Sequence, residues 1–289
     1  MIPSSFDYQR PDSLAEAVQA LSAHGEDAKI LSGGMSLIPL LKLRLAAPGV
    51  LIDINGIPGL DSMEEVDGHL HIGALVRESA LETSDLIASR YPALADTASV
   101  VADPLVRNRA TVVGNVAHGD PANDHPATML AMGATAVLQG PGGERSVHMD
   151  DFFTGLFMTA LQPDEIMTAL RIPSPGPGSG GAYVKMERKV GDFATAAVAV
   201  QLSLDATGVC TGARVGLTNV GFTPILATAA GEALVGHTLD DDAVGAAAAL
   251  AAEAASPVPD RRGSVEYKTS LVRVLTGRAI RRAGARATT

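Results

Sequence analysis

The chain has 289 residues, a length that predicts about two domains of ordinary size. Lys and Arg number 22 against 32 Asp and Glu, and the resulting net charge of −10 argues against a general nucleic-acid surface. Aromatic residues make up 3% of the sequence and none is Trp, so stacking platforms for single-stranded nucleic acid are not expected either.

The sequence contains one cysteine, Cys210. A single thiol cannot form an intrachain disulfide, and it provides too few ligands for an iron–sulfur cluster or a thiolate zinc site. No run approaches the roughly 18 uninterrupted apolar residues of a membrane span, and residues 1–7 lack a basic region followed by an apolar one. We therefore expect a cytoplasmic protein in which any metal redox centre belongs to another chain.

The first 55 residues predict a βαβ unit. The expected elements are a helix over 13–24, a strand over 29–31, a glycine loop over 32–36, a helix over 37–45 and a strand over 50–54. Such a crossover is normally right-handed, with parallel strands. The glycine loop then lies between the carboxyl end of a strand and the amino end of a helix, where backbone N–H groups favour an anion.

Residues 56–175 predict a mixed or antiparallel sheet beside that unit. Asp67-Gly68 is a strong hairpin turn, and a second turn is expected at residues 140–143. The predicted strands are 63–66, 69–72, 135–139, 146–148 and 165–172, and the predicted helices are 81–88 and 92–101.

A Pro/Gly run over 173–181 predicts a linker that sustains neither helix nor sheet. We expect domain boundaries at 1–175, divided into 1–55 and 56–175, and at 182–286. The second domain should be α+β, because three strands precede three helices. Its predicted strands are 182–189, 194–204 and 209–218, and its predicted helices are 224–234, 240–255 and 264–282.

The stretch 111–124 (TVVGNVAHGDPAND) is the strongest candidate for a binding site. We expect a β-branched strand over 111–113 that breaks at Gly114 into a loop of small and polar residues. Thr111 and Asn115 can present a hydroxyl and an amide beside free backbone N–H groups, while Gly114 allows a ligand close to the main chain. The Asn and Asp residues could instead form only local Asx turns.

The glycine loop over 32–36 (SGGMS) is a weaker signal by itself, because a strand-to-helix turn needs no ligand. It lacks three spaced glycines and the P-loop lysine, which disfavours a standard NAD-binding fold. The simplest account of both loops is that they hold one dinucleotide from two sides.

Polar residues near these loops have two interpretations each. His118 beside Asp120 and Asp124 has no third type of partner, so a metal site is disfavoured. Asp124 could accept hydrogen bonds from a ligand, or could cap the helix that begins near residue 126. Lys185 and Lys189 share one face of a predicted strand, and one of them could reach a bound cofactor or simply face solvent.

Four motifs, in order and over essentially the whole chain, resemble one known family. They are 28–45 (AKILSGGMSLIPLLKLRL), 111–126 (TVVGNVAHGDPANDHP), 185–194 (KMERKVGDFA) and 261–279, with Tyr267-Lys268 and Arg278-Ala279. The sequence resembles the FAD-binding medium subunit of molybdenum hydroxylases, in particular the aerobic carbon monoxide dehydrogenase type.

The resemblance implies an α+β fold. A two-part FAD-binding domain of the vanillyl-alcohol-oxidase (PCMH) type would precede a C-terminal α+β domain, whose sheet the strand pattern predicts to be antiparallel and three-stranded. It also implies non-covalent FAD. By position, the residues expected to contact the cofactor are Ile30, Leu31, Ser32, Gly33, Gly34, Met35, Ser36, Leu37, Ala102, Thr111, Gly114, Asn115, Asp124, Leu161 and Lys185. No catalytic acid or base is expected.

Two positions depart from the family pattern. Met35 stands where many relatives have His or Asn, and Val113 precedes Gly114 where many have a glycine pair. If Val113 faced FAD, the approach would be tighter than in relatives.

The family resemblance implies an electron relay. A large subunit with a molybdenum cofactor would oxidise the substrate, a small subunit with 2Fe-2S clusters would carry electrons, and FAD here would pass them to quinone, NAD or oxygen. A dimer of heterotrimers is implied, cytoplasmic or peripheral to the inner face of the membrane, oxidising CO with water to CO2. Other readings are the flavin subunit of a purine, nicotinate or aldehyde hydroxylase, a free-standing FAD oxidoreductase, or a nucleotide-binding module without redox function.

Overall fold

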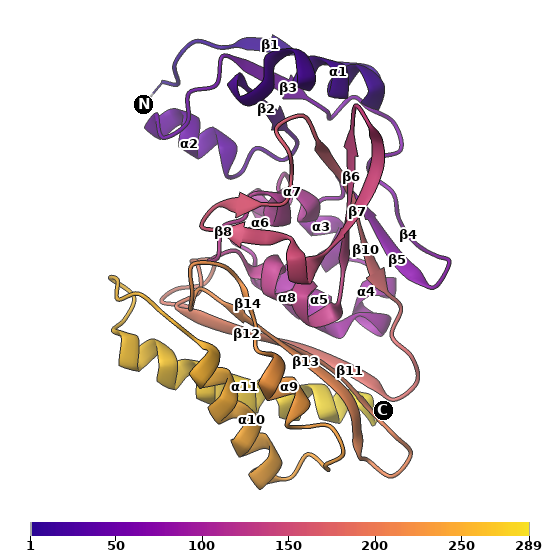
Figure 1. Cartoon of the computed structure of the whole chain (residues 1–289), viewed down its shortest axis with the longest axis vertical. Coiled ribbons are helices and arrows are strands. Elements are labelled where there is room, and N and C mark those ends of the chain that lie inside the picture. The colour runs from indigo at the N-terminus through magenta and orange to yellow at the C-terminus, as the bar shows by residue number, and fades with distance from the viewer. Residues whose placement is uncertain (1, 289) are drawn as a thin grey trace.

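A computed structural model describes residues 2–288 (Figure 1). The chain begins with a three-stranded parallel sheet in the order β1-β3-β2. Its elements are β1 (Asp7–Gln9), α1 (Leu14–His24), the 3-10 turn η1 (Gly25–Asp27), β2 (Ala28–Leu31), α2 (Leu37–Leu43) and β3 (Val50–Asp53). The predicted βαβ unit is confirmed. Strand β1 was not predicted, because its residues are mostly exposed and carry no apolar pattern.

Helix α1 illustrates how local signals place these elements. The Ser13 hydroxyl accepts a hydrogen bond from the Glu16 N–H at 3.2 Å, which satisfies one of the free donors at the helix start. Ala17, Val18 and Leu21 then follow on one face and are buried against the small sheet. The capping residue and the apolar spacing therefore agree, and the helix ends at His24 as predicted.

The second part is a five-stranded antiparallel sheet in the order β4-β5-β10-β6-β7. Asp67 and Gly68 both have positive φ, 50° and 75°, and form the predicted two-residue turn between β4 and β5. The strands are β4 (Met63–Val66), β5 (His69–Gly73), β6 (Thr135–Gly140), β7 (Gly143–His148) and β10 (Ile166–Pro173). A 3-10 turn, η2 (Met149–Asp151), and a small hairpin of β8 (Phe153–Gly155) and β9 (Met158–Thr159) lie between β7 and β10.

Short helices connect β5 to β6. They are α3 (Glu78–Glu82), α4 (Asp85–Arg90), α5 (Pro92–Val100), α6 (Pro104–Arg107), α7 (Val112–Ala117) and α8 (Asp124–Met132). Of these, α7 and α8 pack against the sheet. The single helix predicted over 81–88 is wrong, because the chain breaks there and the Ser84 hydroxyl caps α4 by accepting from the Ile87 N–H.

The strand predicted over 111–113 is also wrong. Thr111 is the N-cap of α7, and its hydroxyl accepts a hydrogen bond from the Gly114 N–H at 3.2 Å. Val112, Val113 and Val116 are all buried in the main apolar core. Burial of this helix face outweighs the β propensity of the valines, which is small compared with the free energy of burying them.

The C-terminal part is a sheet of four antiparallel strands in the order β11-β12-β13-β14. Its elements are β11 (Ser179–Met186), β12 (Ala196–Leu204), β13 (Cys210–Thr218), β14 (Ile225–Leu226), α9 (Thr228–Glu232), α10 (Asp241–Ala254) and α11 (Val265–Ala287). The sheet has one short strand more than predicted, because residues 225–226 pair with β13 instead of opening a helix at 224.

This sheet lies between two helical layers (Figure 1). Helices α9 and α11 pack against one face of the sheet, and α10 packs on both of them from outside. Helices α5 and α8 of the preceding part pack against the other face. The contact is close, since a Cβ at Gly216 would come within 2.1 Å of the Ala127 carbonyl oxygen. The expectation that 173–181 sustains no sheet is wrong at both ends: Pro173 pairs with His69, and β11 starts at Ser179. The domain boundaries remain a prediction.

Candidate functional site

A cavity of about 530 Å³ opens where the first βαβ unit, the second part and one segment of the C-terminal part meet. Both predicted loops border it. All the predicted site residues line it except Leu31 and Lys185. Those that line it are Ile30, Ser32, Gly33, Gly34, Met35, Ser36, Leu37, Ala102, Thr111, Gly114, Asn115, Asp124 and Leu161. Residues far apart in the sequence are therefore brought to one site.

The two glycine loops are in direct contact. A Cβ built at Gly33 would lie 2.5 Å from the Arg109 carbonyl oxygen and 2.9 Å from the Thr111 nitrogen. The Ser32 and Thr111 hydroxyls are 3.1 Å apart. Only glycine permits this approach, so the first loop is fitted to the backbone of the second.

Free backbone donors lie in the first loop. The N–H groups of Gly33 and Met35 donate to no other residue in the described part of the chain. Gly34 has a φ of 73°, a left-handed conformation that turns the chain from β2 toward α2. Unpaired backbone N–H groups beside a cavity form the kind of surface that binds phosphate oxygens.

Asn115 supplies an unused acceptor. Its side-chain oxygen is buried and has no hydrogen-bond partner among the described residues. The backbone carbonyl of Asn115 accepts a hydrogen bond from the Asn123 side-chain amide at 2.8 Å, which fixes the backbone at this residue. A buried acceptor without a partner costs free energy, roughly 1–3 kcal/mol, unless a ligand or water donates to it. This atom therefore fits a ligand that carries hydroxyl or amide donors.

Val113, which departs from the family pattern, borders the same cavity while remaining buried. Met35, the other departure, lines the cavity and is half-buried. Leu31 lies behind the loop, where its Cδ1 would meet a Cβ at Gly34 at 3.1 Å.

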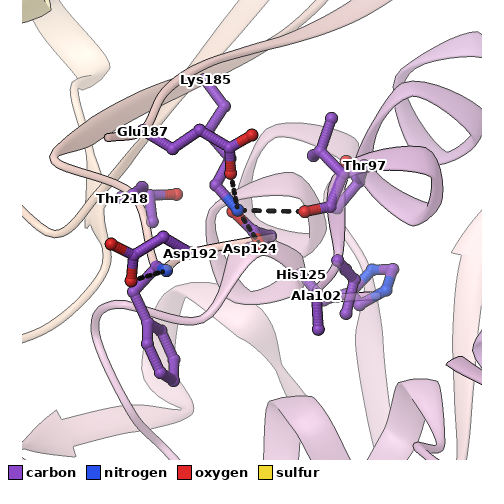
Figure 2. A network of polar contacts seen from close by, with 12 residues as sticks. Thr97, Ala102, Asp124, His125, Lys185, Glu187, Asp192 and Thr218 are labelled. Atoms are coloured by element: carbon purple, nitrogen blue, oxygen red, sulfur yellow. Dashed lines mark hydrogen bonds and ion pairs between the residues drawn. The ribbon is translucent and has the colours of Figure 1, made fainter. Parts of the chain in front are cut away.

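Lys185 lies behind the wall of the cavity. Figure 2 shows it extending from β11 to Asp124 at the start of α8, with Nζ 3.0 Å from the Asp124 carboxylate and 3.0 Å from the Val100 carbonyl oxygen. The Tyr183 hydroxyl donates to the other Asp124 oxygen at 2.6 Å. Asp124 is the first residue of α8, and Asn123 occupies the cap position. The Asp124 carboxylate therefore joins α8 to the C-terminal sheet.

Burial raises the pKa of Asp124 above its usual value, although Lys185 and Tyr183 act in the opposite direction. The Tyr183 pKa is also raised, first by burial and then by the neighbouring carboxylate. A buried carboxylate of this kind depends on its partners, because the desolvation of an unpaired charge is costly.

His118 lines the cavity, and burial lowers its pKa. Its ring lies 5.4 Å from the ring of Phe157, on the loop between β8 and β9. Within residues 2–288, no group of three or more His, Cys, Asp or Glu side chains is arranged to hold a metal ion. The nearby carboxylate of Asp120 opposes the effect of burial on the His118 pKa.

The sequence reasoning missed one wall of the cavity, Gly191, Asp192 and Phe193. Asp192 accepts hydrogen bonds from Arg262 at 3.0 Å and Arg188 at 3.1 Å, and chiefly the Arg262 bond lowers its pKa to about 2. These residues belong to the motif 185–194 that supports the resemblance. The motif indicated that this segment matters for the resemblance, but no spacing rule indicated which of its side chains reach the cavity.

Comparison with known proteins gives a consistent result. Residues 4–175 match the model of the FAD binding domain in molybdopterin dehydrogenase, and residues 181–283 match that of the CO dehydrogenase flavoprotein C-terminal domain. The carbon monoxide dehydrogenase medium chain of Afipia carboxidovorans is 47% identical, and the match covers 99% of each chain. The nicotine 6-hydroxylase medium subunit of Paenarthrobacter nicotinovorans is 37% identical over 96% of this chain and 97% of its own.

The fold agrees with these matches. A chain in the crystal structure of cyanide-inactivated Cu,Mo-CO dehydrogenase superposes with a TM-score of 0.96 and 47% identity, over 99% of this chain and 100% of that one. The α+β fold class expected from the sequence is confirmed. With the cavity, the two glycine loops and both family models in agreement, the chain belongs to the family of flavoprotein subunits of the molybdopterin dehydrogenases.

Proposed function

We propose that the chain binds FAD non-covalently in the cavity between its two glycine loops. The observation that carries the proposal is the direct contact of Gly33 with the backbone of residues 109–111, which brings the free donors of the first loop and the unpaired acceptor of the second into one site. The unpaired Asn115 oxygen and the unpaired N–H groups of Gly33 and Met35 fit a ligand rich in phosphate and hydroxyl groups.

Each part of the cavity would then have one role. The N–H groups of Gly33 and Met35, with the Ser32 and Thr111 hydroxyls, would bind the diphosphate. Asn115 would accept a hydrogen bond from the ribityl chain. Ala102 and Leu161 would border the ring systems, and Lys185 would act through Asp124. Bound FAD would supply the redox chemistry, while the protein positions it and excludes water.

The chain would serve as the medium subunit of an aerobic carbon monoxide dehydrogenase. Electrons from oxidation of CO and water to CO2, on a large molybdenum-cofactor subunit, would pass through 2Fe-2S clusters of a small subunit to FAD. Two features support this assignment. Identity is higher to a carbon monoxide dehydrogenase medium chain, 47%, than to a nicotine hydroxylase subunit, 37%. Cys210 alone cannot ligate a cluster, so the clusters belong to a partner.

We further propose a dimer of heterotrimers, cytoplasmic or peripheral to the inner face of the membrane. None of the helices in residues 2–288 is both long and apolar enough to cross a bilayer. Quinone, NAD and oxygen are the candidate acceptors. The alternative within the family is a flavin subunit acting with a purine, nicotinate or aldehyde hydroxylase. The 37% identity to a nicotine 6-hydroxylase subunit supports this alternative. A free-standing FAD oxidoreductase would need a substrate pocket of its own.

Purification of the native complex tests the assignment. The expected result is copurification of this chain with two other subunits, with molybdenum, iron and FAD present together and dye reduction that depends on CO. Reduction with xanthine, nicotinate or an aldehyde, but not with CO, would replace the carbon monoxide assignment with the alternative. Isolation of the chain as a lone, active flavoprotein would contradict the subunit role, and a chain that takes up no FAD would contradict the whole proposal.

A further inference from the structure

Two side chains outside the cavity join the two glycine loops from behind. The Asn55 amide nitrogen donates to the Ser32 carbonyl oxygen at 2.9 Å, and the Asn55 oxygen accepts from Arg77 Nη2 at 2.5 Å. Arg77 Nη1 donates to the Arg109 carbonyl oxygen at 2.6 Å. Neither Asn55 nor Arg77 lines the cavity. We call this chain of hydrogen bonds, from Ser32 through Asn55 and Arg77 to Arg109, the strut.

The first sheet holds Asn55 at one end of the strut. The Asn55 amide also donates to the Asp53 carboxylate at 2.6 Å, and the Tyr8 hydroxyl donates to the other Asp53 oxygen at 2.6 Å. Tyr8 and Asp53 belong to neighbouring strands β1 and β3. The orientation of the Asn55 amide is therefore set by the first sheet, with its nitrogen toward Ser32 and its oxygen toward Arg77.

The strut determines which way the first loop faces. All peptide bonds of the described chain are trans, so the N–H of Gly33 points opposite to the Ser32 carbonyl. Because Asn55 holds that carbonyl, the Gly33 N–H is directed away from Asn55. Gly33 lines the cavity and its N–H has no partner in the described residues. Without Asn55, the peptide could rotate and present a carbonyl oxygen, which repels a phosphate.

Arginine suits the other end of the strut. Its planar fork donates to Asn55 and to the Arg109 carbonyl at the same time, which a lysine ammonium on a flexible stem does not reproduce. The Arg109 carbonyl oxygen is also the atom that a Cβ built at Gly33 would approach most closely. Arg77 thus holds the second loop at the place where the first loop meets it.

We propose that Asn55 and Arg77 are positioning residues of the dinucleotide site, which set the spacing and direction of both loops without touching the ligand. This inference rests on the proposed FAD function. It predicts that the loops lose their alignment when either side chain is shortened, even though every residue that lines the cavity is unchanged.

The test uses the 289-residue chain freed of flavin and titrated with FAD, following the quenching of flavin fluorescence. Arg77→Ala and Asn55→Ala should each raise the Kd for FAD by about 10-fold to 100-fold, the effect of losing hydrogen bonds to a charged group. Arg77→Lys keeps the charge but not the fork, so it should bind FAD nearly as weakly as Arg77→Ala. Full recovery by lysine would indicate a role for charge alone and overturn the inference.

Arg286→Ala is the matched control. Arg286 is also half-buried and also spans two acceptors, Asp96 and the Gly181 carbonyl, but it lies outside the cavity lining. It should reduce thermal stability and leave the Kd for FAD unchanged. Equal loss of FAD affinity in Arg286→Ala and Arg77→Ala, in proportion to their losses of Tm, would overturn the inference.

Hydrogen exchange separates this inference from the proposed function. In the flavin-free chain, amides of residues 32–36 and 109–115 should exchange faster in Arg77→Ala and Asn55→Ala than in the wild type or Arg286→Ala. A wild-type chain that binds no FAD would contradict the proposed function. Unchanged exchange in both variants, or unchanged FAD affinity in variants of a chain that binds FAD, would contradict the strut alone.

Discussion

Gly33→Ala tests the contact between the two glycine loops with a single carbon atom. The added Cβ would lie 2.5 Å from the Arg109 carbonyl oxygen and 2.9 Å from both the Ala110 Cα and the Thr111 nitrogen. All three are backbone atoms, so no side-chain rotation relieves the overlap. The loops must separate by about 0.9 Å before the shortest of these distances reaches the 3.4 Å at which ordinary van der Waals contact begins. Overpacking of this kind costs about 1–3 kcal/mol.

That separation should weaken FAD binding, because both loops must reach the same diphosphate. A loss of about 1–3 kcal/mol corresponds to a Kd raised about 5-fold to 150-fold. The assay is titration of the flavin-free chain with FAD, beside urea unfolding of the same samples. Gly245→Ala in α10 is the control, since a Cβ there meets nothing within 4 Å and alanine favours the helix. Unchanged FAD affinity in Gly33→Ala, with the protein folded, would refute the reasoning.

Three further predictions follow from the polar groups. Asn115→Ala should raise the Kd for FAD about 10-fold while leaving the flavin-free chain at least as stable, because its buried oxygen has no protein partner to lose. A fall in Tm without a change in Kd would contradict this role. Lys185→Met should lower the free energy of unfolding by about 3–5 kcal/mol, since it leaves the Asp124 carboxylate buried without a counter-charge. Asp124→Leu in the same chain should restore much of that free energy in urea titrations. The Asp192 pKa of about 2 lies below the ordinary value of 3.8, so the ionised Asp192 stabilises the fold fully above pH 3.8 and loses this effect as the pH falls toward 2. Asp192→Asn should therefore make the free energy of unfolding less dependent on pH between those values. An unchanged slope would exclude Asp192 as the source of that pH dependence.

Features with strong local signals were predicted correctly. The cap at Ser13, the Asp67-Gly68 turn and the order of strand, glycine loop and helix around Gly33 are each encoded within about ten residues. Such patterns act through backbone conformation and apolar spacing, which depend little on the rest of the fold. The pairing of β2 with β3 and the glycine loop after β2 could therefore be derived from the residues alone, whereas the exposed strand β1 could not.

Features that depend on distant contacts were not predictable in the same way. The valines after Thr111 favour a strand locally, but the core that buries them selects a helix. The strut joins Asn55 to Arg77 and then to Arg109, and no residue spacing in the sequence predicts these hydrogen bonds. Lys185 was expected to reach the cofactor, whereas the register of β11 directs it to Asp124 behind the wall. Side-chain direction at such sites is set by tertiary packing.

The most direct test of the account is a crystal structure of the chain with FAD bound. We expect the diphosphate between the loop 32–36 and the start of α7, with a flavin or ribityl donor within hydrogen-bond distance of the Asn115 side-chain oxygen. FAD bound elsewhere, with the Gly33 and Met35 N–H groups and the Asn115 side-chain oxygen still without partners, would contradict it.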